Sequence, residues 1–246
     1  MLGVYSKMTD NKELTYSVPA PPLRTKFLVF DVETTGLLPR QSKTTPTPIS
    51  QYPHIIQLSF AVYDLSQRKV ILEYDSYVRL EEDVVIPEKV VEITKITKAK
   101  CRDEGRDICV VLEKFYEAYM FCEGLVAHNI DFDEKMIQVE LERNREKLMK
   151  SAPYCFMTFN TMYERVHGID RYCTMKKGTD LCNIYHASPD GKKDKKKWPS
   201  LKELYTHLNP TEPITGLHNS MVDVKACLRC YLKMRHNIDD KSVVDN

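Results

Sequence analysis

The sequence has no long hydrophobic run, and this absence limits where the protein acts. No apolar stretch approaches the roughly 20 residues that a membrane-spanning helix needs. Residues 1–20 also lack the apolar core of a signal peptide. The eight cysteines are scattered, without the dense spacing of a disulfide framework. We therefore expect an intracellular protein, in the cytoplasm or the nucleus, with reduced thiols and no membrane association.

A net charge is nearly absent as well, and +1 gives no global attraction to nucleic acid. The distribution is less even, because residues 176–202 carry eight lysines and three aspartates. Such a run can hold phosphates by local electrostatics. Taken alone, the run is more typical of a solvated loop whose lysines keep it soluble.

The chain length suits one sizeable α/β domain. Its 246 residues, 42% of them hydrophobic, are too few for two domains with long tails. Residues 1–24 are polar and carry three prolines before the first apolar run, so they are interpreted as a flexible extension. The domain is expected over residues 25–237, followed by a flexible tail at 238–246.

Hydrophobic periodicity predicts a mixed α/β order. Apolar or alternating runs predict strands at 27–30, 54–65, 69–80, 124–128 and 172–175. Helical spacing predicts helices at 107–122, 132–146, 201–208 and 219–236. Residues 38–53 carry four prolines and are expected to form a loop, whereas residues 148–170 show no clear pattern. Trp198 and two leucines after it are expected to pack the third helix against the sheet.

An acidic pair stands at the end of the first predicted strand. Asp31 and Glu33 alternate, so their side chains share one side of the strand. Two neighbouring carboxylates repel each other unless a cation, a proton or a basic partner is present. Magnesium prefers oxygen ligands, so the pair suits a metal ion that binds a phosphodiester. The alternative is an exposed Glu33 beside an Asp31 that caps a turn.

Two further segments complete a pattern. Residues 31–36 read Asp-Val-Glu-Thr-Thr-Gly, residues 126–133 read Val-Ala-His-Asn-Ile-Asp-Phe-Asp, and residues 218–223 read His-Asn-Ser-Met-Val-Asp. In this order and spacing they resemble the three motifs of the DEDDh (DnaQ-like) 3′-to-5′ exonucleases of the ribonuclease H-like superfamily. The resemblance extends over residues 26–235, nearly the whole expected domain.

The resemblance implies a fold and an activity. The fold is ribonuclease H-like, with a mixed central sheet of about five strands, the first three antiparallel, flanked by helices. The activity is metal-dependent hydrolysis of phosphodiesters at nucleic-acid 3′ ends, with single-stranded or frayed DNA favoured and nucleoside 5′-monophosphates released. The implied cofactor is Mg²⁺ or Mn²⁺, two ions per site. The implied catalytic residues are Asp31, Glu33, Asp133, His218 and Asp223, with the four carboxylates as metal ligands and His218 as the general base.

Each motif leaves a plainer alternative. Asp131 is a rival of Asp133, and it is expected to cap the helix if Asp133 holds the metal. A lone histidine before a helix is usually a surface residue, but four residues separate His218 from Asp223, as in the family. Histidine accepts a proton near neutrality, which suits a base on the approach to a helix.

The same resemblance suggests contacts to substrate. Leu37 is expected to wedge against the last base, and His128 with Asn129 either touches substrate or forms a buried hydrogen-bonded pair. The full set of substrate-binding candidates is Thr34, Thr35, Gly36, Leu37, His128, Asn129 and Lys202. Insertions at 44–53 and 154–168 leave substrate preference open.

Alternatives to a DNA exonuclease remain within and outside the enzymes. An RNA-trimming 3′-to-5′ exoribonuclease of the same family is one, because recognition of the 2′ hydroxyl depends on pocket shape. A catalytically idle nucleic-acid-binding protein is another. A polymerase, repair or homodimer partner is compatible with the sequence. The cysteines at 173, 182, 227 and 230 are a weak candidate for zinc, since the last two also suit a helix core.

Overall fold

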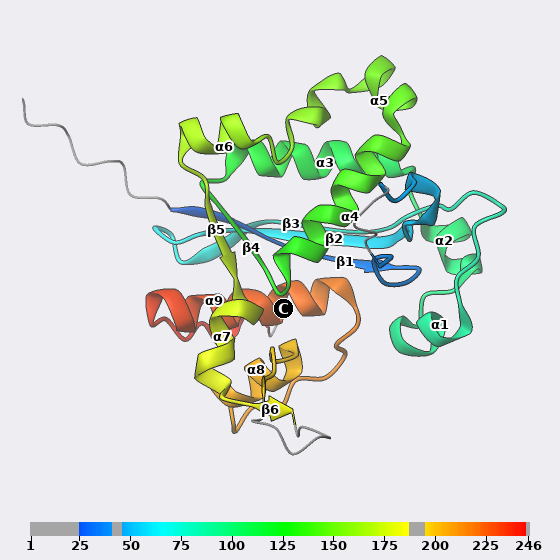
Figure 1. The fold of residues 1–246 in the computed structure, drawn as a ribbon. Coiled ribbons are helices and arrows are strands. Elements are labelled where there is room, and N and C mark those ends of the chain that lie inside the picture. The colour runs from blue at the N-terminus through cyan, green and yellow to red at the C-terminus, as the bar shows by residue number, and fades with distance from the viewer. Residues whose placement is uncertain (1–24, 41–45, 187–194, 245–246) are drawn as a thin grey trace, which may run out of the picture.

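The structure is a computed structural model, and it describes residues 25–40, 46–186 and 195–244 (Figure 1). The extension predicted at residues 1–24 lies outside this part of the chain, as do lysines 192 and 193. Within the described residues, no helix combines the length and apolarity needed to cross a membrane.

A five-stranded sheet forms the centre of the molecule, in the order β3-β2-β1-β4-β5. Its strands are β1 (Lys26–Thr34), β2 (Ile55–Asp64), β3 (Lys69–Tyr77), β4 (Gly124–Ala127) and β5 (Asp170–Cys173). β1, β2 and β3 pair antiparallel, whereas β4 runs parallel to β1 and to β5. The predicted mixed sheet, with its first three strands antiparallel, is confirmed.

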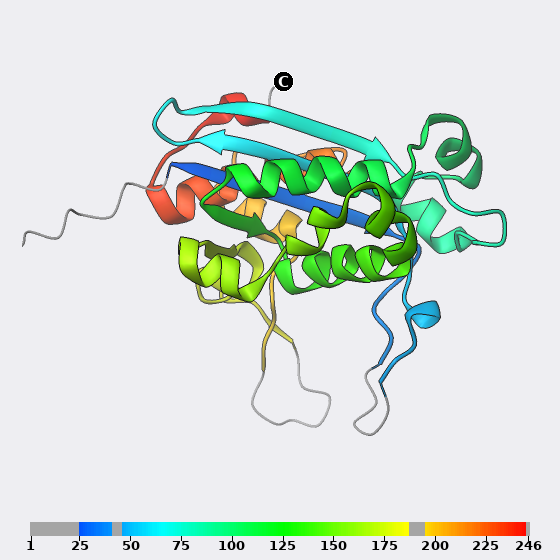
Figure 2. The same cartoon turned by 90° about the horizontal axis from the view of Figure 1, so that it is seen from above.

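Helices cover both faces of the sheet, and β1 contributes to the packing on each. On one side lie α3 (Ile108–Phe121) and α4 (Ile130–Arg143), seen in front of the strands in Figure 2. On the other lie α7 (Thr174–Cys182), α8 (Leu201–Leu208) and α9 (Ser220–His236) (Figure 1). Phe30 packs against Phe115 of α3, and Phe27 packs against Tyr231 of α9. Alternate side chains of β1 therefore enter opposite cores, which places the strand at the centre of the fold.

Several short elements were not predicted from the sequence. They are α1 (Glu88–Thr94), α2 (Lys98–Glu104), α5 (Arg145–Ser151), α6 (Thr161–His167), the hairpin strands β6 (Tyr185–His186) and β7 (Lys195–Lys196), and the 3-10 turns η1 (Ile49–Gln51), η2 (Pro153–Met157) and η3 (Lys241–Val243). The first two helices have seven residues each, and only one of their side chains is buried. Such short helices show too little apolar periodicity to be recognised.

Two local predictions are wrong. The strand expected at 172–175 ends at Cys173, because the chain turns there into α7. Trp198 was expected to pack α8 against the sheet, but its side chain is 60% exposed and the buried leucines 201 and 204 do that work. The domain boundaries stay a prediction. Beyond residue 237, Ile238 and Val243 remain in contact with the core on the α9 side.

Candidate active site

The end of β1 holds the first two acidic side chains. Asp31 lies inside the strand, and its Oδ2 atom has no hydrogen-bond partner among the described residues. Burial raises the pKa of Asp31 to about 7, while the Ser220 hydroxyl opposes the rise. Glu33 follows two residues later, just before the pairing with β2 shifts by one residue. Such a bulge redirects the chain at the end of a strand.

Helix α4 brings the third carboxylate to β1. Asp133 lies in its first turn and is buried, with Oδ1 accepting a hydrogen bond from the Val32 amide at 3.2 Å. Burial, together with the negative charge of Asp31, raises the pKa of Asp133 well above its usual range. Asp131 is exposed and pairs with Lys176 instead. Asp131 does not cap the helix, because Asn129 is the N-cap residue.

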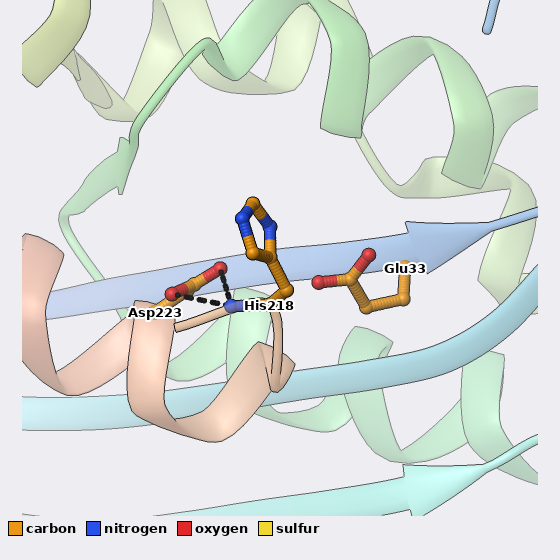
Figure 3. A group of neighbouring side chains, drawn as sticks. All are labelled: Glu33, His218 and Asp223. Carbon is orange, nitrogen blue, oxygen red and sulfur yellow. Dashed lines mark hydrogen bonds between the residues drawn. The ribbon is translucent and has the colours of Figure 1, made fainter. Parts of the chain in front are cut away.

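Helix α9 supplies the remaining predicted residues. The Asn219 side chain caps it by accepting hydrogen bonds from the amides of Met221 and Val222. Asp223 therefore lies in the first turn. His218 stands just before the cap with a positive φ of 71°, and its amide donates to both carboxylate oxygens of Asp223, at 3.3 and 3.4 Å (Figure 3).

Glu33, His218 and Asp223 form a cluster that could hold a metal ion. Each offers one ligand atom, and the three atoms lie within 4.8 Å of one another. Figure 3 shows the His218 side chain rising between the two carboxylates. Burial raises the pKa of Glu33 to about 9, with the charges of Asp31 and Asp223 adding to the rise. Burial and the charge of Asp31 raise the pKa of Asp223 to about 8.

The chemistry of this donor set fits a cation. Carboxylates forced together in a buried place favour the protonated form unless a positive charge joins them. The orphaned Oδ2 of Asp31 is an unused oxygen ligand of the kind that Mg²⁺ and Mn²⁺ bind. Glu33 and Asp223 therefore lie where a hard divalent ion would relieve their repulsion. Asp31 and Asp133 are outside that group of three, but the charge of Asp31 acts on Glu33, Asp133 and Asp223.

Sequence reasoning missed the part that Ser220 plays. Its hydroxyl donates to the main-chain oxygen of Asp31 at 2.7 Å, and its amide donates to the side chain of Gln57 at 3.3 Å. These bonds tie the start of α9 to β1 and β2. The complete burial of Ser220, which these bonds accompany, is a property of the folded chain and gives no signal in the sequence.

The last residue of β1 and the residues after it form a partly exposed turn. Thr34 is buried, and its hydroxyl donates to the Gly36 carbonyl at 2.6 Å. Thr35 exchanges two hydrogen bonds with the backbone of His54, at 2.9 Å each. Leu37 is 86% exposed, so it is free to meet a ligand. The roles of these residues in substrate binding stay predictions.

The substrate-binding candidates near β4 and α8 differ in how exposed and how constrained they are. His128 is held at both ring nitrogens, with the Thr174 hydroxyl 3.0 Å from Nδ1 and the Pro199 carbonyl 3.0 Å from Nε2. Burial lowers its pKa to about 4. This geometry favours bracing over substrate contact. Asn129 adopts a left-handed conformation at the start of α4, and Lys202 is exposed on α8.

The lysine run is only partly described. Lys196 pairs with Asp180, and Lys197 pairs with Glu203. β6 and β7 project from the same side of the molecule as the chain after β1 (Figure 2). Among the described residues, the group suited to a metal contains no cysteine. Cys227 and Cys230 are buried in the core beneath α9, as the alternative to a zinc site requires.

Comparisons with known proteins agree with this geometry. A family model described as "Exonuclease" matches residues 28–231. No curated protein sequence matches the chain. Among solved structures, exonuclease I of E. coli in complex with a dT13 oligonucleotide superposes with a TM-score of 0.58 at 18% identity, over 87% of this chain and 42% of that chain. Exonuclease I from Methylocaldum szegediense gives 0.56 at 19% identity, over 87% and 41%. The chain thus spans less than half the length of these structures, and at this identity the likeness concerns the fold.

Proposed function

Because the chain belongs to the exonuclease family, we propose that it removes nucleotides one at a time from the 3′ ends of nucleic acids and releases nucleoside 5′-monophosphates. The observation that carries the proposal is the cluster of Glu33, His218 and Asp223, together with the buried Asp133 and the buried, unpartnered Oδ2 of Asp31 among the described residues. The solved exonuclease I structure with a dT13 oligonucleotide supports single-stranded DNA as the favoured substrate.

The four carboxylates are proposed to hold divalent metal, two Mg²⁺ or Mn²⁺ ions when the site is loaded. Asp31, Glu33, Asp133 and Asp223 would be the ligands. Metal held there would provide Lewis-acid chemistry, a lowered pKa of bound water and stabilisation of charge on the leaving 3′ oxygen. The protein contributes a fixed arrangement of ligands, since β1, α4 and α9 are tied to one another by the hydrogen bonds of Asp133 and Ser220.

His218 is proposed to take the proton from the attacking water. Its side chain is exposed and stands next to Glu33 and Asp223. Its backbone is anchored because its amide donates to Asp223, while the exposed side chain is accessible to water.

The turn after β1 is proposed to hold the terminal nucleotide. Thr34 to Gly36 present backbone groups there, and Leu37 would pack against the last base. Lys202 would meet the phosphate backbone further upstream. These contacts place the last phosphodiester at the carboxylates, which converts binding energy into orientation of the scissile bond.

The test uses single-stranded DNA and RNA of one sequence, each labelled at the 5′ end, with magnesium or with a chelator. We expect a ladder that shortens from the 3′ end only with magnesium, and chromatography should identify nucleoside 5′-monophosphates. A circular single strand should stay intact. Immediate release of the labelled nucleotide would contradict the polarity. Faster loss of RNA would favour the RNA-trimming alternative, and tight binding without cleavage would favour the idle one.

A further inference from the structure

Helix α4 carries a second buried carboxylate, Glu140, seven residues after Asp133. Seven residues make about two helical turns, so both side chains face the sheet. Oε1 of Glu140 accepts a hydrogen bond from the Ile55 amide at 3.1 Å, as Asp133 accepts one from Val32. The helix is therefore tied to β1 at one point and to the beginning of β2 at another.

Arg143 completes this contact and extends it to the chain before β2. Its Nη1 pairs with Glu140, whose side chain is 3% exposed. Its Nη2 lies within donor distance of three carbonyl oxygens, those of Ile49 (3.3 Å), Tyr52 (2.9 Å) and Pro53 (3.1 Å). A planar guanidinium can bridge a carboxylate and several carbonyls at once, which the point charge of a lysine cannot.

The clamped segment leads directly to the turn after β1. His54 follows Pro53 and exchanges two hydrogen bonds with Thr35, one through the Thr35 amide and one through its hydroxyl. The regular pairing of β1 with β2 shifts between Glu33 and Thr34. After this shift, Thr35 is held by its two hydrogen bonds to His54. His54 in turn follows the segment whose carbonyls Arg143 binds, so its position depends on the contact between Arg143 and Glu140.

We infer that Arg143 and Glu140 are positioning residues for the terminal nucleotide, acting through His54 on Thr35. The inference rests on the proposed function, which places the terminal nucleotide at that turn. A second Glu-Arg pair on the same stretch of chain shows the contrast. Glu142 and Arg145 have the same spacing, but their side chains are 47% and 53% exposed, and within the described chain the pair binds no carbonyl of another segment.

The first test compares Arg143→Lys with Arg145→Lys. Lysine keeps a positive charge beside Glu140, which favours folding, but it lacks the planar guanidinium that reaches the carboxylate and the carbonyls together. The probe is thymidine 5′-monophosphate p-nitrophenyl ester, which contains a single nucleotide. We expect Arg143→Lys to raise its KM by about tenfold and Arg145→Lys to leave KM unchanged. A smaller folded fraction would lower the apparent kcat and leave KM alone, so the KM change separates positioning from loss of structure.

Amide hydrogen exchange gives a readout that needs no turnover. In Arg143→Lys, residues 49–55 and the Thr35 amide should exchange faster than in Arg145→Lys. Unchanged exchange in Arg143→Lys, or an unchanged KM when the variant is active, would overturn this inference and leave the proposed function intact. A wild-type protein that hydrolyses neither oligonucleotide nor ester would overturn the proposed function, and this inference with it.

A double-mutant cycle tests the route through Thr35. Thr35→Val removes the hydroxyl that accepts from His54 and keeps the side-chain shape. If Arg143 acts through this turn, Arg143→Lys should raise KM much less in the Thr35→Val background than in the wild type. Equal fold-changes in both backgrounds would show that Arg143 acts by another route, and would refute the inference.

Discussion

Without metal, the fold should lose stability as the pH rises above neutrality. Burial and like charges hold the pKa of Glu33 at about 9, whereas its ordinary value is 4.5. Between these values the folded protein keeps a proton that the unfolded chain has released. Protons therefore favour the folded state, and the free energy of unfolding falls with increasing pH. Asp223, with a pKa raised to about 8, acts in the same direction.

The size of the loss can be worked out for Glu33. Each pH unit in which the two states differ by one proton changes the free energy of unfolding by about 1.4 kcal/mol. From about pH 6.5 to about pH 8.5 this one carboxyl accounts for about 3 kcal/mol. The comparison starts at about pH 6.5 because of His54 and His128, whose pKa values burial lowers to about 4. Below their ordinary pKa of 6.5, these two histidines make the fold more stable as the pH rises, which would oppose the effect of Glu33.

Urea denaturation at the two pH values, with chelator or with excess magnesium, measures the effect. We expect the loss in chelator, and its reversal by magnesium mainly at the higher pH, because the ion binds ionised carboxylates. Glu33→Gln, which cannot ionise, should reduce the pH slope and weaken the magnesium effect. Glu92→Gln, at an exposed position on α1, should leave both unchanged.

Two results would refute this reasoning. One is a pH slope in Glu33→Gln equal to that of the wild type. The other is stabilisation by magnesium to the same extent at both pH values, because an ion held by the raised-pKa carboxylates must compete with protons at the lower one.

Single substitutions separate the parts of the site. His218→Ala should lower kcat for nucleotide release by about 10² to 10⁴ with KM nearly unchanged; an equal loss in the exposed control His207→Ala would contradict a role as base. Asp133→Asn should abolish both nucleotide release and the magnesium-dependent stabilisation, whereas Asp131→Asn on the same turn should retain them. Leu37→Ala should leave the Tm within about 1 °C because the side chain is exposed, while raising KM for oligonucleotides; an unchanged KM would rule out contact with the last base.

The sequence predicted those parts of the fold that follow from regular periodicity. Phe27 to Phe30 form an apolar run that predicts a strand buried on both faces, and this strand is the centre of the sheet. Alternation along it places Asp31 and Glu33 on one side, and the structure brings both to the same cluster of acids. Helices α3, α8 and α9 lie within two residues of their predicted bounds, because their apolar faces are long enough to show the helical repeat.

Contacts between distant segments could not be predicted in this way. Glu140 and Arg143 have the same spacing as Glu142 and Arg145, and sequence alone does not tell a buried clamp from a surface pair. The usable signal was the interval of seven residues from Asp133, which puts Glu140 on the buried face. The prediction for Trp198 was wrong because a large apolar side chain is usually buried. Here it lies exposed, two residues before the N-cap of α8.

The two anchor points of α4 restrict how this stretch of chain can change during evolution. Asp133 and Glu140 must reach β1 and β2 from one face of the same helix. A single inserted or deleted residue between them would rotate the later one by about 100° and turn its side chain away from the sheet. Relatives that keep both carboxylates should therefore keep the number of intervening residues, with apolar side chains at the buried positions of Met136, Ile137 and Val139 and freer variation at the other three.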